Sequence, residues 1–436
     1  AVLRRTDRIG PCAQAMALIQ CILAIGVMQV ASTFRSPFKE IILFFMCVGV
    51  LWGGLLVEQA SKPATDGPGP PEGWSWREEN KEKSEKSVTS NSKNKKKRKA
   101  AKEGADEEEE EDDEETIRLQ PEVLMLGSAK TGKSLGVALV PGNPGIPHYY
   151  CGFGEELQKS FEAEGLDSPT IYCVGYVNFA TQAERVTKRQ KAGPVSVVEE
   201  SARIAEVLEE LQASHPDGFI IFGHSIGAWM VLQHLKSRTA DEVPFAVLAM
   251  PFLEYRPFSM QPLLALLPPF LARLVSLTAA ALPSKAKDFL AVPVSRNSRG
   301  SFPHDVTTKS FFCQPHQFPA VLELYRTEGP RLDAATSGQG FSECETILSK
   351  KDRPRILALY TKGDMWAPLE HSRRLRGLLS QKDEVIDLSA DVAVDVKLGA
   401  PGHSFVLSRE HSKSVAGIVA ASFARNTAGS GTGPNR

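Results

Sequence analysis

The chain has 436 residues and a formal net charge of −1, from 51 Lys and Arg against 52 Asp and Glu. This length gives room for one large domain with additional segments, or for two domains. The seven cysteines are odd in number and include no Cys-x-x-Cys pair. Their pattern argues against a zinc site or a disulfide framework and favours a reducing compartment, so we expect no metal ion.

Residues 1–58 contain two apolar segments, at about 12–34 and 41–57, joined by a short turn that contains proline. The first is long enough to cross a bilayer, and the second is at the short end for a span. We interpret them as a membrane-anchoring hairpin that either spans the bilayer or is embedded from one side; a cleaved targeting peptide is the alternative. Basic residues flank both outer ends and place them on the cytosolic side: Arg4, Arg5, Arg8 and Lys62.

Residues 59–116 form a charged segment that we predict to be a disordered linker. It is rich in Pro and Gly at 63–71, basic at 93–99 and acidic at 106–115. Such a composition buries too little apolar surface to offset the entropy of the chain. The basic cluster would also fit a nuclear address or a nucleic-acid patch. Its position after a membrane anchor and before its own acidic run favours a solvated tether, so we expect no nucleic-acid partner.

A globular domain is predicted at 117–426, followed by a disordered tail at 427–436. It begins with strand-like segments at 123–126 and 135–140, and the residues between them, 127–134, match the Walker A pattern as Gly-Ser-Ala-Lys-Thr-Gly-Lys-Ser. A P-loop that binds nucleotide must be followed by a helix, whereas a strand follows here. We therefore interpret this match as a chance event in a hairpin turn and expect no nucleotide or other cofactor.

Helix and strand patterns then alternate, which predicts an α/β fold with a mostly parallel sheet and helices on both faces. Ligands should bind at the carboxyl ends of its strands. The expected helices lie at 154–163 and 195–213, and the expected strands at 170–176, 219–222 and 245–250.

One segment, 219–227, reads Phe-Ile-Ile-Phe-Gly-His-Ser-Ile-Gly and leads into an amphipathic helix. An apolar strand, Gly-x-Ser-x-Gly and a helix form the nucleophile elbow of an α/β-hydrolase, in which the tight turn leaves no room for a Cβ at either glycine. The elbow predicts Ser225 as the nucleophile; a Ser/Gly turn in another kind of α/β domain is the alternative. The oxyanion hole should use the backbone N–H groups of Ile226 and of Asn143, which lies in the Gly/Pro-rich loop after the strand at 135–140.

The alternation stops between Phe252 and about Phe312. A strongly apolar stretch at 262–275 is split by Pro268 and Pro269. We predict a lid insertion at about 252–312, which would shelter an acyl chain or dip into a lipid surface. An ordinary helical cap packed on the core is an equal alternative.

The sheet resumes at 355–360, and Asp364 follows this strand directly. His403 lies in a Gly/Pro-containing loop after a last strand expected at 392–398. The order Ser225, Asp364, His403 is the order of the triad in an α/β-hydrolase. Other candidates for the acid remain: Glu254, Asp387, Asp391 and Asp395. His224 should point away from the Ser225 hydroxyl and shape the elbow, and the other histidines lack the strand-end context: His148, His215, His234, His304, His316, His371 and His411.

Four blocks together resemble the lipid-droplet-associated hydrolase family, a branch of the α/β-hydrolases. They are Pro-Gly-Asn-Pro-Gly with a following Tyr-Tyr pair, Gly-His-Ser-Ile-Gly, Gly-Asp-x-Trp-x-Pro at 363–368 and Gly-His-Ser-Phe-Val at 402–406. The resemblance covers roughly 117–426 and implies the same triad of Ser225, Asp364 and His403. The family is associated with lipid droplets and the endoplasmic reticulum and is classed as ester hydrolases.

The resemblance thus implies a serine hydrolase that cleaves lipid or sterol esters through an acyl-enzyme. The basic residues that flank the apolar segments place its catalytic domain on the cytosolic side. It implies no metal or cofactor. The chain departs from the family by its N-terminal apolar hairpin and long charged tether. Two other functions use the same features: a non-catalytic lipid-surface scaffold, and an acyltransferase with the same triad.

Overall fold

The computed structural model describes residues 68–77, 119–127, 135–216, 218–254, 268–295, 302–332, 340–390 and 400–429. The expected membrane hairpin at 1–58, most of the expected linker and the expected strand at 392–398 lie outside these ranges. Within them, no helix is both long enough and apolar enough to cross a membrane.

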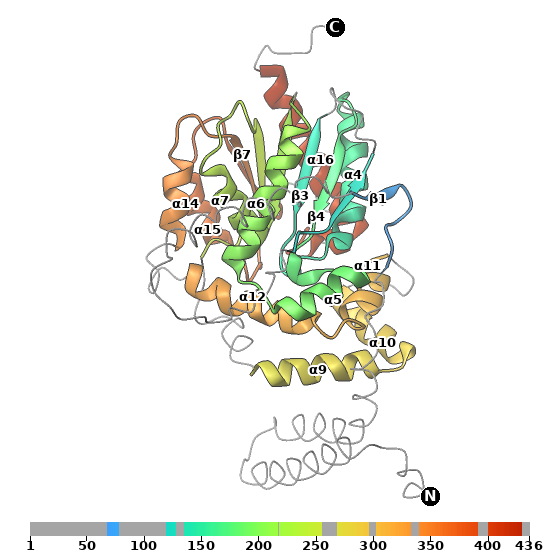
Figure 1. The fold of residues 1–436 in the computed structure, drawn as a ribbon. Helices are drawn as coiled ribbons and strands as arrows, with labels where there is room; N and C mark the ends of the chain where they lie inside the picture. The colour runs from blue at the N-terminus through green and yellow to red at the C-terminus, as the bar shows by residue number, and fades with distance from the viewer. Residues whose placement is uncertain are drawn as a thin grey trace, which may run out of the picture.

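Within the described ranges, eight strands form one sheet in the order β1-β2-β4-β3-β5-β6-β7-β8 (Figure 1). The neighbours β1–β2 and β2–β4 are antiparallel, and every pair from β4 across to β8 is parallel. The central strands are apolar and buried along their whole length, as expected for parallel strands covered on both faces. The strands are β1 Trp74–Trp76, β2 Val123–Leu126, β3 Gly136–Val140, β4 Thr170–Val174, β5 Phe219–His224, β6 Phe245–Ala249, β7 Arg355–Tyr360 and β8 Glu384–Asp387.

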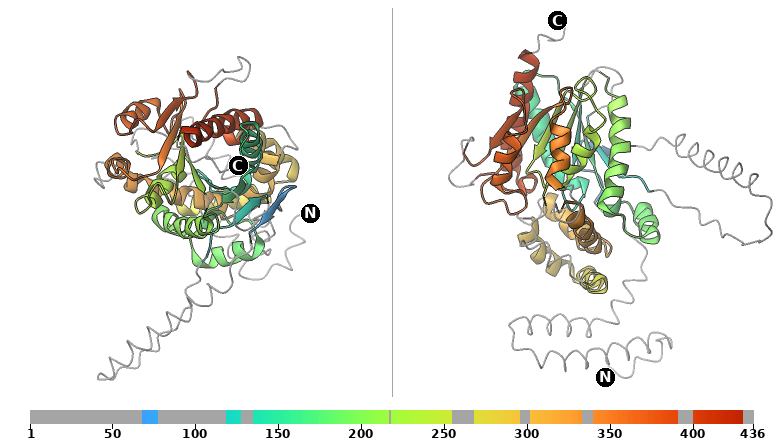
Figure 2. Two further views of the ribbon diagram at one scale, coloured as in Figure 1. Left: turned by 90° about the horizontal axis from the view of Figure 1, so that it is seen from above. Right: turned by 90° about the vertical axis from the view of Figure 1, so that its left-hand side faces the viewer.

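Helices cover both faces of the sheet (Figures 1 and 2). On one face α4 (Cys151–Ala163) packs against α16 (Arg409–Gly429), and on the other α6 (Val197–Ala213) packs against α7 (Ile226–Leu235). Helix α6 begins with a capping box, in which Ser196 and Glu199 satisfy each other's backbone N–H groups. The remaining α-helices are α5 Ala183–Ala192, α9 Pro269–Ala281, α10 Ser284–Ser295, α11 Phe302–Val306, α12 Gln317–Leu332, α14 Gly340–Leu348 and α15 Leu369–Arg376.

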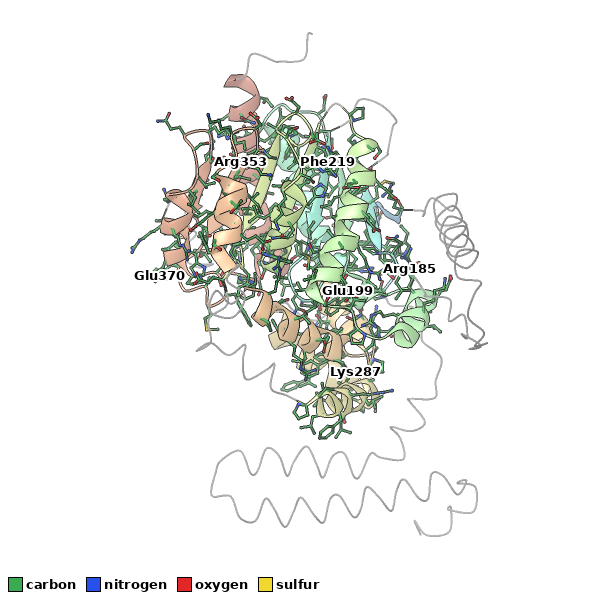
Figure 3. The ribbon with its side chains drawn as sticks, turned by 60° about the vertical axis from the view of Figure 1, so that its left-hand side comes forward. Arg185, Glu199, Phe219, Lys287, Arg353 and Glu370 are labelled. Atoms are coloured by element: carbon green, nitrogen blue, oxygen red, sulfur yellow. The ribbon has the colours of Figure 1, made fainter. Side chains whose placement is uncertain are left out.

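Helices α9, α10, α11, α12 and α14 belong to an insert between β6 and β7. Phe219, where β5 begins, and Arg353, just before β7, lie at one end of the molecule, whereas Lys287 on α10 lies at the other (Figure 3). The parallel strands therefore run toward the insert, and their carboxyl ends face it. The insert continues through α12 and α14, beyond the boundary near 312 that the sequence suggested, because these helices pack on α6, α7 and α9 instead of forming new strands.

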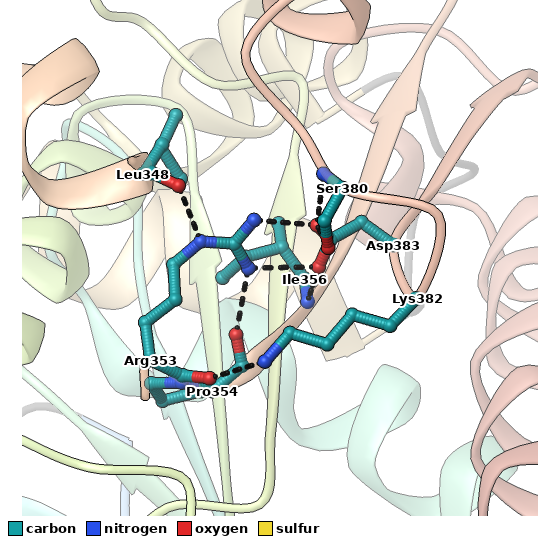
Figure 4. Close-up of polar contacts among 7 residues, drawn as sticks. All are labelled: Leu348, Arg353, Pro354, Ile356, Ser380, Lys382 and Asp383. Carbon is teal, nitrogen blue, oxygen red and sulfur yellow. Dashed lines mark hydrogen bonds and ion pairs between the residues drawn. The ribbon is translucent and has the colours of Figure 1, made fainter. Parts of the chain in front are cut away.

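A buried ion pair lies at the amino ends of β7 and β8 (Figure 4). Arg353 donates to both carboxylate oxygens of Asp383, at 2.8 and 2.5 Å, and its other N–H groups reach the carbonyl oxygens of Leu348 and Pro354. Asp383 also accepts the backbone N–H groups of Ile356 and Ser380. Both side chains are almost completely buried, so the pair links the start of β7 to the turn before β8.

Three predicted elements need correction. Residues 74–76 are not disordered: they form β1, because Trp74 buries its ring beside β2 and donates its indole N–H to Glu155. The strands on either side of residues 127–134, β2 and β3, do not form the expected hairpin, because β4 lies between them in the sheet. The C-terminal helix α16 continues to Gly429, past the predicted domain end at 426, and thereby includes the start of the tail that was expected to be disordered.

Candidate active site

The turn after β5 has the geometry of a nucleophile elbow. Ser225 has φ of 54°, in the left-handed region that side-chain-bearing residues seldom adopt, and it precedes the first residue of α7. A Cβ on Gly223 would lie 2.6 Å from the Cα of Ala228, and one on Gly227 would overlap the carbonyl oxygen of Pro141. The two glycines therefore allow the tight turn and the close approach of the loop after β3.

The structure brings together the three residues expected from the sequence. His403 Nε2 lies 3.1 Å from Ser225 Oγ, and His403 Nδ1 lies 2.7 Å from Asp364 Oδ2. Ser225 is at the end of β5, Asp364 follows β7, and His403 precedes the turn at Phe405–Leu407. The three side chains meet at the carboxyl edge of the sheet although they are far apart in the chain.

Asp364 is held as a carboxylate. Its Oδ1 accepts the backbone N–H groups of Trp366 and Ala367, at 2.8 and 3.0 Å, and its Oδ2 faces His403. Burial raises the pKa of this carboxyl group, but the hydrogen bonds and the charge of His403 outweigh burial and hold the pKa below its usual value. An ionised Asp364 fixes His403 with a proton on Nδ1, which leaves Nε2 free to accept the serine proton.

The loop at residues 141–146, called the oxyanion loop below, lies against the elbow. The N–H of Gly142 donates to the hydroxyl of Tyr150 at 2.8 Å, so this N–H is engaged. Asn143 follows it and lines the same cavity as Ser225. Ile226 is the first residue of α7, where backbone N–H groups have no partner within the helix. The arrangement is compatible with the backbone donors expected from the sequence, Asn143 and Ile226.

His224 and Tyr150 add a contact that the sequence did not predict. The Tyr150 hydroxyl lies 2.5 Å from His224 Nδ1, and the His224 ring packs against that of His403 with centroids 5.0 Å apart. Burial, followed by the nearby His403, lowers the pKa of His224 to about 3, so the ring is neutral and carries one proton. Because the Tyr150 hydroxyl keeps its own proton and faces Nδ1, we assign Nδ1 as the nitrogen without a proton. The Tyr150 hydroxyl therefore donates to His224 while it accepts from Gly142, which connects the elbow to the oxyanion loop. Tyr150 belongs to the Tyr-Tyr pair, but nothing in the sequence signals this contact.

A cavity of about 210 Å³ opens at Ser225 and His403. Its volume lies between that of a site for benzene, about 150 Å³, and the roughly 300 Å³ at which pockets for larger ligands begin. The cavity thus has room for a short acyl group beside the serine. The other lining residues are Gly142, Asn143, Pro144, Tyr149, Tyr150, His224, Phe311, Ser404, Val406 and Leu407.

The rival acids have other partners or lie outside the described part. Glu254 is 3.3 Å from Arg374 and 3.5 Å from His371, and Asp387 accepts the backbone N–H of Ser389. Asp391 and Asp395 are outside the described ranges. Among the described residues, the carboxyl side chain that forms a hydrogen bond with His403 is that of Asp364.

The described residues offer no group of three or more His, Cys, Asp and Glu side chains arranged to hold a metal ion. The Walker A match is followed by strand β3, and a P-loop would need a helix there.

The chain matches one known protein family. The model of the family described as lipid-droplet associated hydrolase matches residues 133–406, whereas no curated protein matches the chain. Similar solved structures include the peroxisomal alpha-beta-hydrolase Lpx1 of Saccharomyces cerevisiae, at 13% identity, 71% coverage of this chain and 84% of that chain, with a TM-score of 0.46. An esterase from Exiguobacterium antarcticum has 12% identity, 70% and 96% coverage and a TM-score of 0.43.

A monoacylglycerol lipase from Paleococcus ferrophilus has 17% identity, 70% and 100% coverage and a TM-score of 0.40. These structural likenesses are too distant to carry an argument about chemistry. The family match spans more than half of the chain and includes Ser225, Asp364 and His403. The chain belongs to the lipid-droplet associated hydrolase family.

Proposed function

We propose that the protein is a serine hydrolase that cleaves carboxylic esters of lipids at the surface of lipid droplets or the endoplasmic reticulum. The observation that carries this proposal is the position of His403, which is 3.1 Å from Ser225 Oγ on one side and 2.7 Å from Asp364 on the other. A scaffold without activity has no need of this geometry, so the short distance favours an enzyme.

In the proposed reaction, Ser225 Oγ attacks the ester carbonyl carbon while His403 Nε2 takes the hydroxyl proton. Asp364 orients His403 and stabilises the imidazolium that forms. The tetrahedral intermediate collapses, the alcohol leaves with the proton from His403, and an acyl-enzyme on Ser225 remains. Water, deprotonated by His403, then attacks the acyl carbon. The bond between this carbon and Ser225 Oγ breaks, His403 returns the proton to Oγ, and the acid is released.

The backbone N–H groups of Asn143 and Ile226 stabilise the oxyanion of the intermediate. Both flank Ser225, one from the oxyanion loop and one from the start of α7. Loss of one such donor typically slows a reaction by about 10²–10³-fold. The Tyr150 hydroxyl supports the oxyanion role of Asn143. It accepts the backbone N–H of Gly142, the residue directly before Asn143, so the backbone N–H of Asn143 is left to bind the substrate.

Attachment to a lipid surface is supported by the insert. Five of the seven large apolar side chains that are exposed in the described part lie on α9 and α10, with Phe270 at 69% and Phe289 at 70% exposure. These helices lie at the end of the molecule toward which the strands run, the same end as the triad (Figure 1). Exposed apolar surface of this kind marks an interaction site, and we assign it, together with the apolar segments of residues 1–58, to a lipid surface with the domain on its cytosolic side.

Hydrolysis of a panel of short-chain, long-chain and sterol esters by the full chain, Ser225→Ala and His403→Ala tests this function. We expect wild-type protein to release free acid, and Ser225→Ala to lose activity by a factor on the order of 10⁶. Formation of a new ester when an alcohol is added would instead indicate an acyltransferase. Absence of both products in wild-type protein, with an intact fold, would favour the scaffold.

A further inference from the structure

One face of helix α12 contacts the two loops beside the active site. Val321, Tyr325 and Glu328 are four and three residues apart, a spacing that places them on the same side of a helix. Val321 is 8% and Glu328 2% exposed. The helix belongs to the insert and lies below α6 and the sheet in the view of Figure 1, at the end of the molecule toward which the parallel strands run.

Two of these residues hold the side chain of Asn143. The Asn143 Nδ2 atom donates to the carbonyl oxygen of Val321 at 3.2 Å. The Glu328 carboxyl group is buried on the same face of α12, close enough to the Asn143 side chain for that side chain to lower its pKa as a hydrogen-bond donor. The backbone N–H of Asn143 is a proposed oxyanion donor. Because the side chain is fixed from α12, the direction of this N–H depends on the insert as well as on the sheet.

The third residue reaches the other half of the site. The ring of Tyr325 stacks on that of Trp366, with centroids 5.5 Å apart and planes within 5° of parallel. The backbone N–H of Trp366 donates to Asp364 at 2.8 Å. Helix α12 therefore contacts the loop of the triad acid through Tyr325 and the oxyanion loop through Val321 and Glu328.

We propose that Glu328 is a positioning residue for the oxyanion loop and that α12 ties this loop to the loop of Asp364. The inference rests on the proposed ester hydrolysis. It means that the insert does more than cover the site: it sets the relative position of the oxyanion donor and the triad acid.

The protonation state of Glu328 fits a role in positioning the oxyanion loop. Burial raises the pKa of its carboxyl group to about 8, against an opposing hydrogen bond from Asn143, so the group is neutral at pH 7. The titratable neighbours of Glu328 are Tyr176, beside the oxyanion loop, and Tyr325 on α12. Burial is the main cause that raises the pKa of both tyrosines, and the charge of Glu328 raises it further. A neutral acid can hold Asn143 without opposing the negative charge of the oxyanion, which an ionised carboxylate would do.

The full chain carrying Glu328→Gln, Glu328→Ala or Glu323→Gln is compared with wild type on a soluble short-chain ester. Glu323 lies on the same helix, is more exposed and pairs with Arg326, so Glu323→Gln is the matched control. We expect Glu328→Ala to lower kcat by about 10- to 100-fold, a part of what loss of an oxyanion donor costs, with KM changed by less than about threefold. Glu328→Gln keeps an oxygen that accepts from Asn143 and should retain the wild-type kcat at pH 7.

The pH profile separates positioning from a general loss of structure. In wild-type protein kcat should fall as the pH rises through about 8, where Glu328 ionises, and in Glu328→Gln this alkaline fall should be absent. Equal kcat for Glu328→Ala and the Glu323 control would overturn the proposal. So would an alkaline fall in Glu328→Gln that equals the wild-type fall, and this second result decides the question even if Glu328→Ala does not fold. Full activity of Ser225→Ala would refute the proposed function itself, independently of α12.

Discussion

Replacing Tyr150 with Phe removes one hydroxyl group from beside the nucleophile and leaves the aromatic ring in place. This hydroxyl accepts the N–H of Gly142 at 2.8 Å and donates to His224 Nδ1 at 2.5 Å. Burial raises the pKa of Tyr150 far above its usual value, so the donor proton is retained at any working pH. The substitution therefore leaves two buried polar groups without a partner.

Each unsatisfied buried group costs about 1–3 kcal/mol, so Tyr150→Phe should lower the free energy of unfolding by about 2–6 kcal/mol. The released Gly142 N–H directly precedes Asn143, so the proposed oxyanion donor loses its fixed direction. We expect kcat to fall by about 10-fold or more, with a smaller change in KM.

The neighbouring tyrosine provides the control. The Tyr149 hydroxyl contacts Thr307 Oγ1 at 2.8 Å. When the tyrosine hydroxyl is removed, the Thr307 hydroxyl keeps its hydrogen bond to the carbonyl oxygen of Pro303. Tyr149→Phe should therefore cost about 0.5–1.5 kcal/mol, the net value of an ordinary hydrogen bond. Urea denaturation and ester hydrolysis of both variants provide the measurements. Equal loss of stability and of kcat in the two variants would refute the assigned role of Tyr150.

Three further predictions concern the rest of the molecule. Arg353→Met leaves Asp383 buried without its cation and should lower the free energy of unfolding by about 3–5 kcal/mol in urea denaturation, with kcat unchanged. Burial opposes the ion pair, but Arg353 and backbone donors hold the pKa of Asp383 below its usual value. Its stabilisation is therefore present above the ordinary aspartate pKa and lost as the pH falls below it, and acid unfolding of the variant should show less of this dependence. Deletion of residues 1–58 should move the protein to the soluble fraction after centrifugation. If the shortened protein stays on membranes, Phe270→Ser combined with Phe289→Ser should release it. Retention on membranes after all three changes would contradict attachment by either region. Without a lipid surface, esters with acyl chains of roughly eight carbons or fewer, scaled from the volume of a benzene site, should be cleaved faster than long-chain esters, because the cavity at Ser225 has a volume of about 210 Å³. The reverse order would contradict a cavity of this size.

The α/β sheet could be predicted because its central strands are continuous apolar runs between turn signals. Strands β3, β5, β6 and β7 fall where the sequence placed them. The two edges were harder to predict. The short strand β1 lies within a charged segment, and β8 reads Glu-Val-Ile-Asp and is only half-buried, so neither has the long apolar run of a central strand.

The order Ser225, Asp364, His403 was predictable because each residue lies at a strand end in the chain order of the fold. The supporting contacts were not predictable. Glu328 lies on an amphipathic helix on which a glutamate normally faces solvent, and its burial depends on how the insert packs. The Tyr150–His224 contact joins residues 74 positions apart, and no spacing in the sequence indicates it.

The central claim is that Ser225 is an activated nucleophile. Treating the full chain with a fluorophosphonate probe and locating the adduct by mass spectrometry of proteolytic peptides tests it most directly. We predict one phosphonyl adduct, on Ser225, in the wild-type protein, and none at this position in His403→Ala over the same reaction time, because Nε2 is the base that takes the serine proton. An adduct on another residue, or labelling of Ser225→Ala equal to that of the wild type, would contradict the claim.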